Sequence, residues 1–109
     1  MTAHADRERD FAFMGWVKSQ RCLLALEGDA GECSGGGWAW SEADHAGERA
    51  GWRRADDDTC IPLCQRHHRD RTERRGWFAG RPWAWMRAWC DRAIEATRER
   101  WAAWQTANF

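Results

Sequence analysis

The chain has 109 residues, enough for one domain with a modest hydrophobic core. Its 17 Lys and Arg residues balance 17 Asp and Glu residues, which excludes a protein that binds nucleic acid through overall basic charge. No apolar run approaches the roughly 18 residues of a membrane span, and the N-terminus lacks the pattern of a signal peptide. We expect residues 1–5 to be disordered and residues 6–109 to form a single cytoplasmic domain.

The first half of the chain is predicted to contain a helix, a loop and a strand. Residues 6–20 have helical periodicity. The apolar side chains fall on and beside one face: Phe11, Met14 and Val17 or Lys18 on it, Phe13 and Trp16 beside it. The Gly-rich residues 21–37 are predicted to form a loop. Residues 38–45 are predicted to form a strand.

The second half is predicted to contain a short strand and two helices. A polar loop over residues 46–58 leads into a strand over residues 59–63. Pro62 indicates that this strand either lies at a sheet edge or ends at that residue. One helix is predicted over residues 64–75, ending near Gly76. A long helix follows from about Arg81 to about Thr106, with Pro82 in its first turn. Its apolar stripe predicts a core-facing surface: Met86, Cys90, Ala93, Ile94, Thr97, Trp101 and Trp104. The fold class is α+β.

Ten Trp residues are an unusual feature of a chain this short. We expect them to form the core, because Leu and Ile are few; the alternative is exposed Trp rings that stack on bases or contact a partner. Arginine greatly outnumbers the single Lys18. This bias suits bidentate phosphate contacts, and GC-rich codon usage explains it equally well.

A Cys-x-x-His pair, Cys64 and His67, has the spacing of a zinc knuckle, because one helical turn puts both groups on the same side. A structural zinc site needs two more ligands, and Cys22 and Cys33 are the natural pair. Cys60 could replace one of them. The alternative is a set of buried free thiols, which are ordinary core residues.

Two stretches together resemble a known family: Ala43-Asp44-His45-Ala46-Gly47, and Asp57-Asp58-Thr59-Cys60-Ile61-Pro62-Leu63-Cys64-Gln65-Arg66-His67-His68. They resemble the metal core of HNH, or ββα-metal, endonucleases, and most closely the small HNH-like proteins of phages and prophages. The resemblance covers roughly residues 11–80. It implies a zinc-stabilised ββα-metal domain, here with an N-terminal helix before it and the long C-terminal helix after it.

The resemblance also implies a function, namely metal-dependent hydrolysis of DNA phosphodiester bonds with weak sequence preference, inside a bacterial host cell. By resemblance, Asp44 and His68 hold Mg²⁺ or another divalent cation, and His45 is the general base. Asp suits a hard cation, and His has a pKa near ambient pH. Further candidate ligands are Asp57, Asp58 and Asp70, with Asp58 the first choice.

Arginine residues near this core are candidate contacts to DNA phosphates: Arg49, Arg53, Arg54, Arg66, Arg69 and Arg71. The chain also departs from the family pattern. Thr72 stands where a second helix His is expected, and the central Asn is absent. These departures motivate an alternative function, a catalytically inactive, zinc-stabilised module that binds DNA or, through its Trp-rich helix, a protein.

Overall fold

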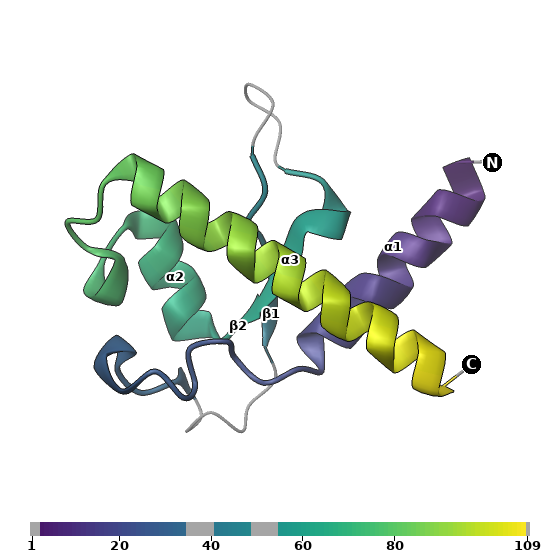
Figure 1. Cartoon of the computed structure of the whole chain (residues 1–109), viewed down its shortest axis with the longest axis horizontal. Coiled ribbons are helices and arrows are strands. Elements are labelled where there is room, and N and C mark those ends of the chain that lie inside the picture. Colours follow the sequence, from purple (N-terminus) through teal and green to yellow (C-terminus); the bar gives the residue numbers. More distant parts are fainter. Residues whose placement is uncertain (1–2, 35–40, 49–54, 109) are drawn as a thin grey trace.

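The computed structural model describes residues 3–34, 41–48 and 55–108. Within these ranges the chain has the predicted α+β class, with three α-helices and one two-stranded antiparallel sheet (Figure 1). The helices and strands, in chain order, are α1 Ala3–Lys18, β1 Glu42–His45, β2 Cys60–Leu63, α2 Gln65–Glu73 and α3 Trp83–Asn108. The order β1, β2, α2 matches the predicted strand–strand–helix unit.

The register of the sheet sets which side chains share a face. Asp44 pairs with Ile61, and His45 pairs with Cys60. Directly paired residues lie on the same face of an antiparallel sheet, and successive residues alternate between faces. Asp44 therefore shares the face of Ile61, whereas His45 shares the opposite face with Cys60. The two neighbouring candidate residues point to different sides of β1.

Helices α1 and α3 cover the two faces of the sheet. Cys60 packs into a buried cluster with Phe13, Trp16 and Val17 of α1. Ile61 and Leu63, on the other face, pack into the larger core with residues of α3. All four residues of β2 are buried. Figure 1 shows α3 crossing the sheet diagonally, with α2 to the left and α1 to the right of the strands in this view.

The buried face of α1 differs from the predicted one. Phe13, Trp16 and Val17 are buried, whereas Phe11 is 64% exposed. The spacing i, i+3, i+4 of the buried residues is that of a helical stripe. The stripe is fixed by α3, because the centroid of the Trp101 ring lies 5.7 Å from the ring centroid of Phe13 and 5.2 Å from that of Trp16. Phe11, which the sequence puts on one helical face with Met14, therefore lies outside the buried stripe.

The helix boundaries shift by a few residues from those predicted. Helix α1 begins at Ala3, so residues 3–5, predicted to be disordered, belong to it; Ala is the strongest helix former. Helix α2 begins after Cys64, whose sulfur accepts the backbone N–H of His67, and it ends before Arg74, which adopts a left-handed conformation with φ 56°. A non-glycine residue thus closes α2, ahead of Gly76.

The strands are shorter than predicted. Strand β1 begins at Glu42, and the predicted residues 38–40 lie outside the described ranges. Thr59 belongs to a 3₁₀ turn, Asp57–Thr59, so that β2 begins at Cys60. Among the described residues the sheet has two strands, so Pro62 lies on an edge strand, as predicted.

The stripe on α3 is buried as predicted at Met86, Cys90, Ile94 and Thr97. Farther along, Trp104 is 39% exposed. Many of the described Trp rings lie in two aromatic groups: Trp16, Trp101 and Trp104 in one, and Trp77, Trp85 and Trp89, with Phe78, in the other. Trp83 is 64% exposed, so the prediction that Trp forms the core does not hold for every described ring.

Two glycines give a paired test of the backbone. Gly15 is exposed in α1, and a methyl group there would meet no atom within 4 Å. We expect Gly15→Ala to raise the free energy of unfolding by about 0.5–1 kcal/mol, because Ala favours the helix. Gly31 has φ 82°, and a methyl group there would lie 2.7 Å from Nη2 of Arg66. Gly31→Ala should lower that free energy by about 1–3 kcal/mol. Urea unfolding of both variants checks the signs; loss of stability in Gly15→Ala would contradict this structure of α1.

Candidate metal centres

Four potential metal ligands come together between the loop after α1 and the start of α2. They are Cys22, Cys33, Cys64 and His67, whose donor atoms all lie within 4.8 Å of one another. The Nδ1 atom of His67 lies 3.4 Å from the sulfur of Cys22, 3.6 Å from that of Cys33 and 3.3 Å from that of Cys64. These are the four residues that the sequence predicted as zinc ligands.

The loop that carries Cys22 and Cys33 is held by contacts with β2 and α2. The backbone N–H of Leu23 donates to the carbonyl of Pro62 at 3.0 Å. Farther along, the backbone N–H of Arg66 donates to the hydroxyl of Ser34 at 2.8 Å, and its guanidinium donates to the carbonyl of Glu32 at 2.8 Å. These bonds dock the two ends of the loop on the unit that carries Cys64.

The spacing of the donor atoms fits a tetrahedral zinc ion. With Zn–S near 2.3 Å and Zn–N near 2.0 Å, tetrahedral geometry puts sulfur and nitrogen about 3.5 Å apart. The three S–N distances of 3.3–3.6 Å match this value. The other ring nitrogen of His67 lies 2.8 Å from the carbonyl oxygen of Ala30. Such a carbonyl fixes the tautomer of a metal-binding His, so the four residues could hold a zinc ion.

A cation bound to this group would have to displace protons from buried thiols. Burial raises the pKa of Cys22 to about 12 and raises the pKa of Cys33 above its usual value. Burial opposes ionisation of Cys64 as well, but backbone N–H groups of His67 and Ser34 lower its pKa. Only the thiolate binds metal, so the charge of a bound cation would be needed to keep the three sulfurs ionised together.

The remaining two cysteines do not join this group. Cys60 is fully buried against α1, and Cys90 is buried in the core beneath α3. The alternative in which Cys60 replaces a zinc ligand is therefore not adopted by the structure, because β2 points this side chain toward α1. Cys90 packs in the core, as predicted.

A second set of polar side chains lies where β1 faces α2. Asp44 is 1% exposed, and its Oδ1 lies 3.5 Å from Nε2 of His68. The other ring nitrogen of His68 lies 2.8 Å from Oε1 of Glu42. Glu42 and Asp44 both face α2 because they are two residues apart on one strand. The structure thus brings together the two residues predicted as ligands of a divalent cation, with Glu42 supporting the imidazole.

Arg71 binds Asp44 in this structure. Its Nε and Nη2 atoms donate to the two carboxylate oxygens in a bidentate pair. Burial alone would lower the pKa of Arg71, but the bonds and the charge of Asp44 raise it, so the guanidinium stays charged. Thr72, the position where the resemblance led us to expect a His, is exposed. The residue of this helical turn that reaches Asp44 is therefore Arg71.

The predicted base His45 has a different partner. Its Nε2 lies 2.7 Å from Oδ1 of Asp57, and the His45 side chain is 19% exposed. Asp58, the first choice for a further cation ligand, pairs instead with Arg98 of α3 at 3.0 Å. Among the described residues, the cysteine-rich group is the one set of three or more side chains arranged to hold a metal ion.

The six candidate phosphate contacts have varied surroundings. Arg49, Arg53 and Arg54 lie outside the described residues. Arg66 ties down the loop through Glu32, and Arg71 is engaged by Asp44. Arg69 is exposed on α2. In the described part of the chain, Arg66 and Arg69 are the exposed candidates, and contact with phosphate stays a prediction for all six.

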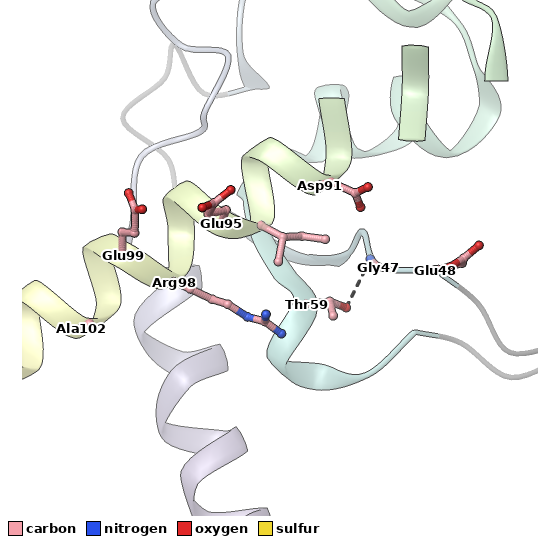
Figure 2. Close-up of a pocket in the computed structure, with 9 residues that line it drawn as sticks. Gly47, Glu48, Thr59, Asp91, Glu95, Arg98, Glu99 and Ala102 are labelled. Atoms are coloured by element: carbon pink, nitrogen blue, oxygen red, sulfur yellow. Dashed lines mark hydrogen bonds between the residues drawn. The ribbon is translucent and has the colours of Figure 1, made fainter. Parts of the chain in front are cut away.

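A groove of about 650 Å³ runs along α3 beside the end of β1. Figure 2 shows acidic side chains on its α3 side and the hydrogen bond from Gly47 to Thr59 on the other. The charged residues of its lining are Glu48, Asp91, Glu95, Arg98 and Glu99. Among the described residues, the lining of this groove is therefore mainly acidic.

Comparison with known proteins finds no match: no family model, curated protein or solved structure is significantly similar to the chain. None of the described helices combines the length and the apolar character that crossing a membrane requires. The arrangement of the two sets of side chains therefore carries the functional argument.

Proposed function

We propose that the chain is a zinc-stabilised ββα-metal domain that hydrolyses phosphodiester bonds of DNA with a divalent cation such as Mg²⁺. The observation that carries the proposal is the packing of β1 against α2, in which Asp44 Oδ1 lies 3.5 Å from His68 Nε2. His45 follows Asp44 at the end of the strand. The zinc ion at the cysteine-rich group is structural: it joins the loop after α1 to the first turn of α2 and so fixes the helix that carries His68.

His45 acts as the general base in this proposal. A proton on Nε2 is held by Asp57, which leaves the lone pair of Nδ1 to accept a proton from the attacking water. The carboxylate also stabilises the imidazolium that results. A divalent cation held by Asp44 and His68 would stabilise the charge that develops on the phosphate and on the leaving oxygen. Arg69, exposed on α2, is a candidate to hold the DNA backbone.

A second candidate function is a zinc-stabilised module that binds DNA without cleaving it. The observation that favours it is the bidentate pair between Arg71 and Asp44, which neutralises the carboxylate without a metal ion. The opposite faces of β1 occupied by Asp44 and His45 favour it as well. This module would keep salt-dependent affinity for DNA.

A supercoiled-plasmid assay tests the proposal with Mg²⁺, Mn²⁺, Ni²⁺ and Zn²⁺ in turn. We expect nicking by the wild type and a loss of about 100-fold or more in His45→Ala, because a positioned base contributes this much. Asp57→Asn should cause a smaller loss. Both variants should keep the circular dichroism spectrum of the wild type, which separates lost chemistry from lost folding.

Three other outcomes are informative. DNA binding without cleavage in any metal would replace the nuclease with the binding module. Equal cleavage by the wild type and by His45→Ala would assign the activity to another group or to a contaminant. If the chain neither binds nor cleaves DNA, the remaining prediction is that the Trp-rich α3 binds a protein partner. Trp104→Ala tests that prediction.

A further inference from the structure

The carboxylate of Asp44 already has a cation bound to it, the guanidinium of Arg71. We propose that Arg71 is a built-in counter-ion that competes with a divalent metal ion for Asp44, so that metal binds only when Arg71 moves away. The inference rests on the proposed function, because it takes Asp44 and His68 as ligands of that ion. It adds a form of regulation: without bound metal, the side chain of Arg71 on α2 closes the site formed by Asp44 and His68.

Asp44 and His68 beside Arg71 offer two donor atoms that one small cation could share. His68 has Glu42 at its Nδ1 at 2.8 Å, and Asp44 Oδ1 faces its Nε2 at 3.5 Å. A metal-binding His commonly donates its other ring N–H to a carboxylate. Octahedral ligands at 2.1 Å from Mg²⁺ lie about 3.0 Å apart. Closing the gap therefore requires a small movement of the two side chains.

The charges explain why Arg71 and a metal ion exclude each other. Asp44 is 1% exposed, and a carboxylate so deeply buried requires a positive partner. Arg71 satisfies this need with bonds to both oxygens. A divalent ion at the same carboxylate would meet the guanidinium as a like charge at close range. One of the two must leave.

Arg71 is the partner that would leave, and leaving breaks its bidentate pair with Asp44. Its side chain is 17% exposed, so part of it already reaches solvent. Its further described contact is a weak one, to the sulfur of Cys90 at 3.9 Å. Rotation of a long side chain can carry the guanidinium into solvent while α2, and with it His68, stays in place.

Titration of zinc-loaded protein with Mn²⁺, followed by electron paramagnetic resonance, tests the competition. Arg71→Met keeps an unbranched side chain and removes the charge, and Arg69→Met is the matched control on the exposed side of the same helix. We expect Arg71→Met to bind one Mn²⁺ at least tenfold more tightly than the wild type. Arg69→Met should bind as the wild type does.

Thermal unfolding with and without Mn²⁺ covers the case in which Arg71→Met is unstable alone. Mn²⁺ should then restore its cooperative melting, because the ion replaces the lost positive charge. The double variant Asp44→Asn/Arg71→Met should fold without Mn²⁺ and show no tightened binding, since it lacks both the charge and the ligand.

Equal Mn²⁺ affinity in Arg71→Met and the wild type overturns the competition, whatever the plasmid assay shows. The failure of the proposed function is a different result: Arg71→Met that binds Mn²⁺ tightly and yet leaves plasmid DNA intact supports the counter-ion and removes the nuclease. Tight binding that persists in the double variant also overturns the inference, because Asp44 would then not be a ligand.

Discussion

Replacing His67 with alanine is expected to unfold the protein at room temperature. His67 is fully buried, and its Nδ1 lies within 3.6 Å of three sulfurs that come from three separate places in the chain. Structural zinc contributes on the order of 10 kcal/mol to the folding of small zinc domains, whereas a domain of this size has about 5–15 kcal/mol in total. Loss of the ion therefore removes most or all of the stability.

Circular dichroism and thermal melting of His67→Ala measure this effect, and chelation of the wild type should reproduce it. Cys60→Ala is the matched control, because it removes a buried sulfur that lies outside the group of four. That variant should stay folded and keep its zinc. A His67→Ala protein that melts as cooperatively as the wild type would contradict a structural zinc.

Breaking the pair between Asp44 and Arg71 has the second largest expected effect. Asp44→Ala leaves the guanidinium without its carboxylate, and removal of one partner of a buried ion pair costs about 3–5 kcal/mol of unfolding free energy. Arg71→Met alone should cost a similar amount, because Asp44 is 1% exposed. The double variant should cost less than the sum of the two single changes, because no charge is then left unpaired.

Urea unfolding of the zinc-loaded single and double variants gives the coupling energy directly. We expect the double-mutant cycle to show a coupling of about 2–3 kcal/mol. Additive costs within about 0.5 kcal/mol would mean that the two residues do not interact. Such a result would also remove the physical basis for competition between Arg71 and a metal ion.

The sequence predicted the four-residue cysteine-rich group well because the motif that indicates it is local. Cys64 and His67 are three residues apart, which one turn of helix places side by side. Cys22 and Cys33 then followed as the remaining pair, although their own spacing carries no regular geometry. Their positions depend on the docking of a loop on β2 and α2, which only the structure reveals.

The second set of side chains was predicted in part. The resemblance put Asp44 and His68 together, and the structure agrees, with Oδ1 and Nε2 3.5 Å apart. Glu42 could have been found as well, because residues two apart on a strand share a face. The pairing of Asp57 with His45 had no such signal, since the two residues are 12 positions apart in the chain.

The orientation of Arg71 could not be read from the sequence. Its place on α2 suited a surface contact with phosphate as well as it suited Asp44. The outcome depends on how α2 rotates against β1, and this rotation is set by tertiary packing. The buried face of α1 is a similar case: Phe11 fits the helical period, but contact with Trp101 selects Phe13 and Trp16.

Native mass spectrometry of the purified chain tests most directly whether a zinc ion pins this domain. The Cys22, Cys33, Cys64 and His67 group predicts one zinc ion per chain, lost together with the folded charge-state distribution on chelation. His67→Ala should not retain the ion. A metal-free wild type that keeps its folded charge states and its melting temperature would contradict the zinc-stabilised domain from which both proposals are built.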